Sequence, residues 1–347
     1  MKNLLKIFIP IGWLYGSVMA LRNMMFNLGI LKTYNAKIPT ISVGNLSMGG
    51  TGKTPHVDFL ISHFKSKFQL AVLSRGYGRR TKGYLKVTEH SSAETVGDEP
   101  LLYKLKHKEE IEVAVCEDRT LGAQKLEQGA FNLLILDDAY QHRKIGRDCN
   151  ILITTFDEPF YKDHVVPAGR LREYRRGKNR ANIIVVSKCP KSLSSEDKRK
   201  IERKINPSNK QKVFFSNIDY GAILPISSQE AWNSENLPEE VLLVTGIANP
   251  EPLQKELEKK FKVELMSFPD HHNYTVNDLN KIHTIFDTFV GQNKAIITTE
   301  KDLMRLKQPQ LLKLIENRPW YYQSITVGLD EETNFLKQIE KHVSANK

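Results

Sequence analysis

Residues 44–54 combine glycines, a lysine and a threonine in the pattern of a loop that binds phosphate. They read Gly-Asn-Leu-Ser-Met-Gly-Gly-Thr-Gly-Lys-Thr and follow the β-branched run 38–43. In such loops backbone N–H groups surround the phosphates, the lysine reaches the terminal ones, and the threonine hydroxyl holds Mg²⁺ at a helix N-terminus. The loop therefore predicts binding of a nucleoside triphosphate. The residues assigned to it are Ser47, Met48, Gly49, Gly50, Thr51, Gly52, Lys53 and Thr54.

A second motif is an apolar run at 133–136 that ends in two acids, Asp137 and Asp138. An acid at the end of a strand can hold Mg²⁺ or its water beside the threonine of a phosphate-binding loop. An apolar run followed by acids is common in proteins, so it indicates a metal site only in combination with the phosphate-binding loop that precedes it in the chain. Together the two motifs predict a magnesium site formed by Thr54, Asp137 and Asp138.

Two further motifs carry groups that move protons. Asp98 and Glu99 lie between a glycine and a proline before an expected helix, where carboxylates also serve as simple caps. His271 and His272 lie in the segment 268–274, which follows an expected strand. Adjacent histidines on a regular element do not face one metal ion, so we favour a histidine oriented by an acid for proton transfer.

Two basic segments are compatible with several partners. Arg75, Arg79 and Arg80 follow an expected strand, and arginine suits planar recognition of phosphate, although a solvated basic loop has the same composition. The segment 170–180 contains six basic residues. It is compatible with a solvated face, a nucleic-acid patch or an anionic-lipid patch.

The composition is typical of a folded protein, with more basic than acidic residues. The chain has 347 residues, 40% of them hydrophobic and 26% charged, which is ordinary for a globular protein and large enough for two domains. A net charge of +11 favours polyanionic partners such as nucleic acid, anionic lipid or a phosphorylated substrate. The three cysteines have no metal-ligand spacing, so neither a zinc site nor a disulfide framework is expected, and a reducing cytosol fits.

The amino terminus has an uncharged apolar stretch at 7–21 with basic residues on both sides. It is shorter than the roughly 20 residues that span a bilayer. Trp13, Tyr15 and Phe26 beside basic flanks suit a segment that lies in the headgroup region of an anionic membrane, which is the interpretation we favour. A secretory signal and a helix packed on its own domain are the alternatives.

Short apolar runs alternate with helical patterns along the chain, which predicts βαβ units. The expected strands of the first part are 38–43, 69–73, 112–116, 133–136, 151–154 and 183–186, and those of the second part are 241–245, 263–267, 295–298 and 321–327. The expected fold is α/β, with a P-loop NTPase-like parallel sheet sandwiched by helices and a second, smaller α/β domain. Ligand chemistry is expected at the carboxyl ends of the strands.

These motifs together resemble the tetraacyldisaccharide 4′-kinase family, the lipid A 4′-kinases of Gram-negative bacteria, nearly end to end. The matching segments are 44–55, Ser-Arg-Gly-Tyr-Gly-Arg at 74–79, Gly-Asp-Glu-Pro at 97–100, Asp-Asp-Ala-Tyr-Gln-His at 137–142, Pro-Ala-Gly-Arg-Leu-Arg-Glu at 167–173, Ser-Lys-Cys-Pro at 187–190, Thr-Gly-Ile-Ala-Asn-Pro at 245–250, Phe-Pro-Asp-His at 268–271 and Thr-Glu-Lys-Asp at 299–302. One departure is Ala139, where the family usually has glycine. It matters if that position needs a positive φ.

The resemblance implies transfer of the ATP γ-phosphoryl group to the 4′-hydroxyl of a tetraacylated glucosamine disaccharide 1-phosphate, giving lipid IVA, with Mg²⁺. It implies work at the cytoplasmic face of the bacterial inner membrane, as a peripheral or monotopic protein, on a lipid substrate and an anionic membrane surface, without nucleic acid. Asp98 and His271 match the family's acid and histidine pair, Lys53 handles phosphate, and Glu173 is matched to an outer contact of the metal.

The expected organisation has four parts: a membrane-associating helical segment at 1–35, a P-loop kinase domain at 36–212, an inter-domain linker at 213–240 and a smaller α/β domain at 241–347. The alternative function is a membrane-associated P-loop switch ATPase, which normally has lysine at the position of Met48. A GTPase lacks support because no base-reading motif with the right spacing is present. A nucleic-acid binder lacks support because no recognition-helix signature is present.

Overall fold

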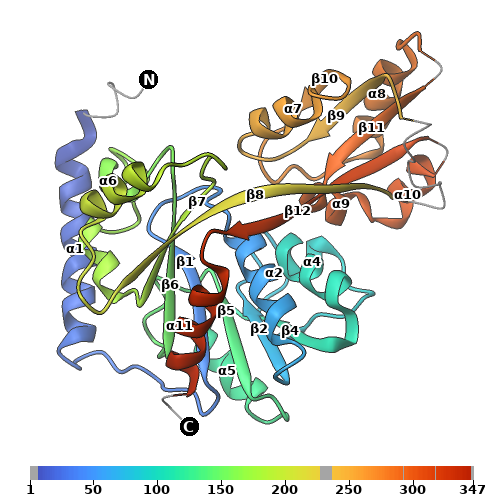
Figure 1. Cartoon of the computed structure of the whole chain (residues 1–347). Coiled ribbons are helices and arrows are strands. Elements are labelled where there is room, and N and C mark those ends of the chain that lie inside the picture. Colours follow the sequence, from blue (N-terminus) through green and yellow to red (C-terminus); the bar gives the residue numbers. More distant parts are fainter. Residues whose placement is uncertain (1–6, 227–236, 292, 317, 345–347) are drawn as a thin grey trace.

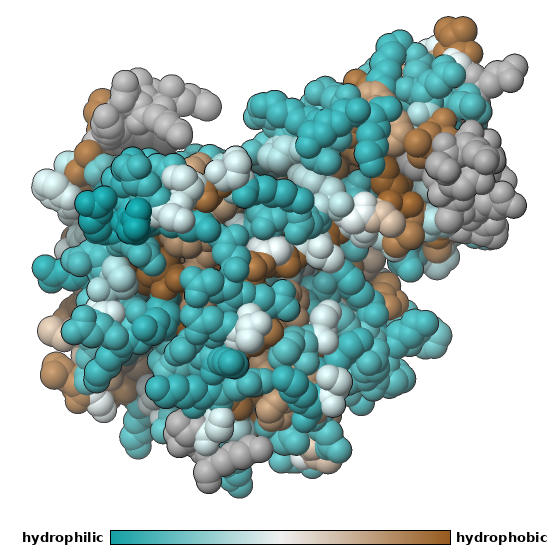
Figure 2. Space-filling model, viewed as in Figure 1, coloured by the Kyte–Doolittle hydropathy of each residue, from teal (hydrophilic) through white to brown (hydrophobic). Residues whose placement is uncertain are grey.

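The computed structural model describes residues 7–226, 237–291, 293–316 and 318–344, which form a larger and a smaller lobe (Figure 1). The smaller lobe projects from one side of the larger one, as the space-filling view also shows (Figure 2). Within the described residues the strands form one 12-stranded sheet in the order β10-β9-β11-β12-β8-β7-β6-β1-β5-β2-β4-β3. The predicted α/β class is confirmed.

The larger lobe has a mostly parallel sheet in which β1 lies between β5 and β6, and its edge strand β3 pairs antiparallel with β4. Its strands are β1 (Thr40–Asn45), β2 (Leu70–Ser74), β3 (Leu85–Lys86), β4 (Ile111–Val115), β5 (Leu133–Asp137), β6 (Cys149–Thr155) and β7 (Ile183–Ser187). Its helices include α1 (Ile9–Asn27), α2 (Lys53–Phe64), α3 (Ala93–Val96), α4 (Asp98–His107), α5 (Arg119–Leu126) and α6 (Ser195–Ile205), with short 3₁₀ turns η2 (Lys108–Glu110), η3 (Phe160–Lys162) and η4 (Arg175–Arg180). The six strands predicted for this part are confirmed.

These strands are continuous apolar runs because both faces of the sheet are covered. On β5, Leu133 and Ile135 enter one core with α2, whereas Leu134 and Leu136 enter a second core with α5. A parallel sheet with helices on both faces requires this two-sided burial. Since β1 and β5 are neighbours, the loops at their carboxyl ends lie side by side, and this places the two acids beside the phosphate-binding loop.

The smaller lobe repeats the architecture on a reduced scale. Its strands are β9 (Glu240–Thr245), β10 (Lys262–Ser267), β11 (Lys294–Thr299) and part of β12 (Trp320–Leu329), and its helices are α7 (Glu251–Leu257), α8 (Val276–Asp287), α9 (Glu300–Leu306) and α10 (Pro309–Ile315). β9, β10, β11 and β12 run parallel where they pair. The four strands predicted here are confirmed.

The interval 213–240, expected as an irregular linker, begins with a long strand. β8 (Lys212–Pro225) pairs in parallel with β7 at its start and antiparallel with β12 along the rest of its length. The two lobes are therefore joined by a two-stranded ribbon (Figure 1). Residues 227–236 of the expected linker lie outside the described residues.

The last helix, α11 (Glu332–Ser344), returns to the larger lobe, although 241–347 was expected to be one domain. Phe335 and Ile339 share a core with Ile41 of β1 and Val57 of α2. The Phe335 ring also lies 5.3 Å from that of Phe214 on β8. Burial of an amphipathic face against the open side of the first sheet explains why the chain crosses back.

Candidate active site

The phosphate-binding loop connects β1 to the N-terminus of α2. Gly49 and Gly52 adopt positive φ values of 102° and 86°, a conformation that glycine takes without strain, and Gly52 directly precedes the first turn of α2. The first N–H groups of a helix have no partner inside it, and they carry the positive end of the helix dipole. The loop thus presents a site for anionic oxygens at Lys53 and Thr54.

Three neighbouring side chains hold this loop in shape. Asn45 Nδ2 donates to Thr51 Oγ1 at 2.8 Å, Ser187 Oγ donates to the Thr51 carbonyl at 2.7 Å, and Lys188 Nζ donates to the Gly50 carbonyl at 2.8 Å. These contacts come from the ends of β1 and β7. The sequence motif did not assign them, since they depend on which strands are neighbours.

The front of the loop is paired with the segment that contains Arg170. Ser47 forms an isolated β-bridge with Leu171, and the Met48 N–H donates to the Arg170 carbonyl at 2.7 Å. In this structure the Met48 amide is therefore occupied by protein. Backbone N–H groups that bind phosphate must therefore come from the part of the loop after Met48.

Asp137 and Asp138 lie beside the loop, and their pKa values shift in opposite directions. Burial raises the pKa of Asp137 to about 7, with further contributions from Glu99 and Asp138. Burial also opposes ionisation of Asp138, but Lys53, whose Nζ lies 3.7 Å from Oδ1, together with Arg172 and Arg119 lowers its pKa. A cation at this site would favour the ionised form of both acids.

The donor set fits Mg²⁺. Ser74 Oγ donates to Oδ2 of Asp137 at 3.0 Å, whereas Oδ1 of Asp137 is buried and has no hydrogen-bond partner among the described residues. That oxygen, the Thr54 hydroxyl and Asp138 are hard oxygen donors. Among the described residues there is no cluster of three or more His, Cys, Asp or Glu side chains placed as metal ligands. Nucleotide sites need no such cluster, because phosphates and water supply the other ligands.

Glu173 is placed differently from its expected role near the metal. Arg180 donates to both of its carboxylate oxygens at 2.7 and 2.8 Å, and Asn23 and Gln141 donate at 2.8 and 3.2 Å. Both oxygens are thereby used in a buried ion pair that joins α1 to η4. The structure therefore gives Glu173 a partner other than the expected metal site of Thr54, Asp137 and Asp138.

Asp98 and His271 meet across the two lobes. Asp98 is the first residue of α4, His271 follows β10, and His271 Nδ1 lies 3.1 Å from Asp98 Oδ2. His271 has a positive φ of 61°. Its ring centroid lies 5.2 Å from that of Tyr77. Burial, and then the charge of Lys301, lower the pKa of His271, so the ring is neutral near pH 7.

Two cations of α9 complete this group, and the sequence motifs assigned no role to either. Arg305 is buried and donates through Nε to Asp98 Oδ1 at 2.9 Å and through Nη2 to Asp98 Oδ2. Lys301 Nζ lies 3.1 Å from His271 Nε2. Their spacing of four residues was a usable signal, since it places both side chains on one face of a helix.

The departure at Ala139 is accommodated. Among the described residues the positive φ in this turn falls at Asp138, at 46°, and not at Ala139. The Ala139 side chain is buried, and Arg147 donates to its carbonyl at 2.5 Å. A side chain at position 139 therefore causes no backbone strain.

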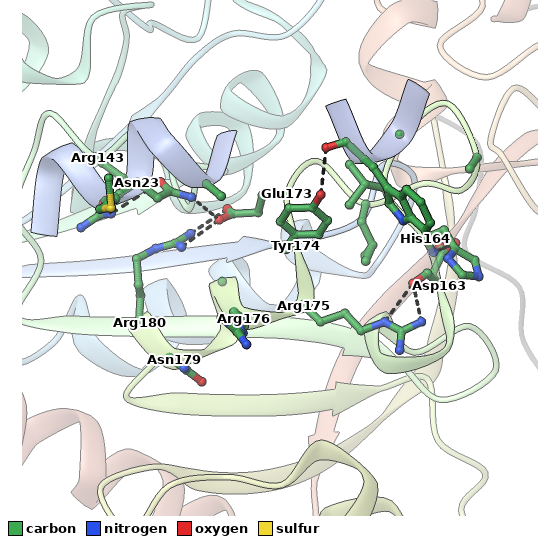
Figure 3. A pocket seen from close by; sticks show the side chains of 18 of the residues that line it. Asn23, Arg143, Asp163, His164, Glu173, Tyr174, Arg175, Arg176, Asn179 and Arg180 are labelled. Carbon is green, nitrogen blue, oxygen red and sulfur yellow. Dashed lines mark hydrogen bonds and ion pairs between the residues drawn. The ribbon is translucent and has the colours of Figure 1, made fainter. Parts of the chain in front are cut away.

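A groove of about 980 Å³ lies between α1 and residues 163–180 (Figure 3). Its α1 wall includes Trp13 and Met24, and its opposite wall includes Arg175 and Arg176. Glu173 also lines it. Gln141 contacts Glu173 at 3.2 Å and Arg172 at 3.4 Å, and Arg172 also pairs with Asp138, so the groove borders the acidic end of the nucleotide site.

The parallel sheet, the phosphate-binding loop and the acids after the neighbouring strand define a P-loop kinase-like α/β enzyme. The family described as tetraacyldisaccharide-1-P 4′-kinase matches residues 4–344. The chain belongs to this family.

Individual relatives agree with that assignment. The tetraacyldisaccharide 4′-kinase of Flavobacterium johnsoniae is 41% identical over 353 residues, covering 100% of this chain and 99% of its own. That of Parabacteroides distasonis is 40% identical, covering 97% and 94%. A crystal structure of LpxK from Aquifex aeolicus in complex with ATP has a TM-score of 0.76 at 30% identity, covering 98% of this chain and 99% of its own.

Family membership makes the chain an ATP-dependent kinase of lipid A biosynthesis that uses Mg²⁺ and acts on a lipid disaccharide. The predicted enzyme class and cofactors are confirmed, and the switch-ATPase alternative is disfavoured.

Proposed function

We propose that this chain transfers the γ-phosphoryl group of ATP to the 4′-hydroxyl of a tetraacylated glucosamine disaccharide 1-phosphate, giving lipid IVA. One observation carries the assignment of residues. Glu99 Oε1 accepts a hydrogen bond from Thr54 Oγ1 at 3.2 Å, while the adjacent Asp98 is paired with His271. The nucleotide loop and the proton-accepting pair are therefore next to each other.

Each residue has a role that its chemistry permits. Asp98, oriented by His271, accepts the proton of the 4′-hydroxyl as its oxygen forms a bond to the γ-phosphorus. The bond from that phosphorus to the β–γ bridging oxygen breaks, and ADP leaves. Lys53 stabilises negative charge on the terminal phosphates. Thr54, Asp137 and Asp138 would hold Mg²⁺, which neutralises phosphate charge when bound.

We propose further that the lobes move relative to each other during the cycle. Asp98 and His271 belong to different lobes, which are joined by the β8–β12 ribbon, and in this structure Arg305 covers both oxygens of Asp98. A hydroxyl reaches Asp98 only after one of these contacts shifts. Opening and closing of the lobes would supply that shift and admit the substrate.

The proposed site of membrane attachment is the outer face of α1. Apolar residues at alternating spacings of four and three form one exposed stripe, with exposed fractions between 55 and 75%. They are Ile7, which lies just before the helix, and Ile11, Leu14, Val18 and Leu21 within it. In Figure 2 the left margin of the view, where α1 lies, has brown apolar patches among white and teal residues. Lys2 and Lys6, expected as basic flanks, lie outside the described residues.

The opposite face of α1 is docked on the larger lobe, so this helix has two different sides. A Cβ atom at Gly16 would lie 2.5 Å from the Tyr174 ring, and Gly12 also packs closely against residues 165–168. Among the described residues, no helix combines the length and apolar character needed to cross a membrane. These features support a helix lying in the headgroup region of the anionic cytoplasmic face of the inner membrane.

The groove beside α1 is the proposed entry for the lipid acceptor. Its apolar wall suits acyl chains, and Arg175 and Arg176 are exposed cations that suit the 1-phosphate. An amphiphile held there would lie between the membrane and the nucleotide site. No nucleic acid is needed as a partner, and the basic surface is assigned to lipid.

The test uses purified full-length protein, ATP labelled at the γ position and the detergent-dispersed disaccharide lipid. Mass spectrometry and ³¹P NMR of the product identify the phosphorylated position. We expect label at the 4′-oxygen and turnover that depends on the lipid. Equal ATP turnover without lipid would instead indicate a switch ATPase, and phosphorylation at another hydroxyl would contradict the proposed regiochemistry.

A further inference from the structure

Lys301 lies between the two halves of the site and contacts both. Its Nζ is 3.1 Å from His271 Nε2 and 3.4 Å from Glu99 Oε1. The same Glu99 oxygen accepts the hydrogen bond from Thr54 Oγ1. A continuous path of polar contacts therefore leads from the phosphate-binding loop through Glu99 and Lys301 to His271.

The contact with Lys301 decides which nitrogen of His271 carries the proton. A lysine ammonium only donates, so Nε2 of the neutral ring must be the acceptor. Nδ1 then carries the hydrogen and donates to Asp98 Oδ2 at 3.1 Å. The opposite tautomer would point an N–H at the ammonium and a lone pair at the carboxylate, so both contacts would be unfavourable.

The nearby Arg305, taken alone, favours the opposite tautomer. Its Nη2 lies 2.9 Å from His271 Nδ1, and a guanidinium only donates, so this contact would require a lone pair on Nδ1. Nη2 also donates to Asp98 Oδ2, however, so the carboxylate is available as its acceptor. Arg305 thus fixes the carboxylate, and the contacts with Asp98 and Lys301 together favour the hydrogen on Nδ1.

We propose that Lys301 is a positioning residue of the phosphoryl-transfer site. It holds His271 as the Nδ1–H tautomer and links the imidazole through Glu99 to the loop that binds nucleotide, so that the Asp98–His271 pair is assembled only when α9 is docked on α4. This inference rests on the proposed role of Asp98 and His271. Side chains of Lys301 and Glu99 are only 24 and 19% exposed, so their interaction is shielded from bulk water.

A neighbouring contact provides a matched control. Glu300 of α9 pairs with Lys106 of α4 at 3.6 Å, so it joins the same two helices. Among the described residues, Glu300 has no hydrogen bond or ion pair with His271. If Lys301 only helped to fasten the lobes together, Glu300→Gln would have a comparable effect.

The first measurement reads the tautomer directly, in full-length protein labelled with ¹⁵N-histidine and assigned by the loss of signals in His271→Ala. In the wild type we expect a protonated Nδ1 and an unprotonated Nε2. Lys301→Met keeps the aliphatic stem but removes the donor, and it should shift His271 to a mixture of tautomers, whereas Glu300→Gln should not. A wild-type ring protonated at Nε2, or one unchanged by Lys301→Met, overturns the inference.

The second measurement is kinetic. Lys301→Met should lower kcat by about 10- to 100-fold, the range of a misplaced acid–base group, with KM for Mg·ATP within about threefold of the wild type. Lys301→Arg should recover most of the loss, and Glu300→Gln should stay within about threefold.

The double variant separates positioning from general support. In a His271→Ala background, Lys301→Met should lower kcat little further, since the effects of residues that act as a unit are not additive. If the kcat of the double variant falls by the product of the two single losses, the inference is overturned. If His271→Ala alone leaves kcat unchanged, the proposed pair fails, and the NMR result still decides whether Lys301 sets the tautomer.

Discussion

His271 and Asp98 are 173 positions apart in the chain, yet Nδ1 of the histidine lies 3.1 Å from Oδ2 of the carboxylate. The contact joins the loop after β10 to the first residue of α4, and α9 packs beside it. One lobe thus supplies the carboxylate and the nucleotide loop, while the other supplies the histidine and its two cations. A site divided in this way is sensitive to the relative position of the lobes.

Asp98→Asn should lower kcat by about 10² to 10⁴-fold and change the affinity for ATP little. The amide keeps the shape of the side chain but cannot accept the hydroxyl proton. Steady-state kinetics and equilibrium binding of ATP are the measurements. Because the variant also weakens the ion pair with buried Arg305, a thermal melt is needed to show that the protein remains folded. Near-normal kcat would refute the role of Asp98.

Lys53→Ala should impair phosphate handling itself, with kcat reduced by about 10²-fold or more and weaker binding of ATP. The ammonium is the cation of the loop, and it also pairs with Asp138 at 3.7 Å. Lys65→Ala, just beyond the other end of α2, removes a surface pair with Glu110 and is the matched control. Equal losses in both variants would indicate damage to the helix and not to the site.

Leu14→Glu combined with Val18→Glu should weaken binding to anionic vesicles by at least about 10-fold. These side chains are 70 and 60% exposed on α1. Burial of each in the membrane would contribute roughly 1.5 kcal/mol or more to the free energy of binding, and the substitution to Glu removes that contribution. Vesicle co-sedimentation measures the change. Val276→Glu, an exposed apolar position on α8, should bind as the wild type does. Unchanged binding of the α1 variant would rule out the stripe as the attachment surface.

Stability should fall with acid because of His56. Its ring is buried, Nδ1 donates to the Gly52 carbonyl at 2.7 Å and Nε2 accepts from Ser216 Oγ at 2.9 Å, and burial lowers its pKa to about 4. In the unfolded chain the pKa is about 6.5. As pH falls from about 6.5 towards 4, the unfolded state therefore binds a proton that the folded state does not, and the free energy of unfolding decreases.

The size of this effect can be measured by urea titrations. Between about pH 7.5 and pH 5 the contribution of His56 is roughly 2 kcal/mol. His56→Gln should flatten the pH dependence by that amount. Parallel curves for the wild type and His56→Gln would show that the ring is not held neutral.

The central strands of both lobes, such as β1, β5, β9 and β11, could be predicted because they are apolar on two faces. Leu133 to Leu136 have alternating directions, but both directions end in a core, so the run is uninterrupted in the sequence. β8 escaped prediction for the opposite reason. Between Asn217 and Gly221 it mixes polar residues and glycine, and only its pairing with β12 makes this segment a strand.

The site also has a part that the sequence predicted and a part that it did not. The phosphate-binding loop is defined by a short run of consecutive residues, so its glycines, Lys53 and Thr54 could be recognised as a motif. Glu173 was matched by its place in a motif, but Arg180 occupies both of its oxygens. The four-residue spacing of Lys301 and Arg305 placed them on one face of a helix, but nothing local showed that this face meets Asp98 and His271.

The order of residues alone determined the α/β class, the nucleotide loop, the acids after β5 and the family. These features depend on short segments whose propensity and spacing are contained within a few residues. The tertiary structure decided what surrounds Asp98, where α11 packs, and that one face of α1 is docked while the other is exposed. Those outcomes depend on which surfaces meet when distant segments bury their apolar faces, and that is a property of the whole chain.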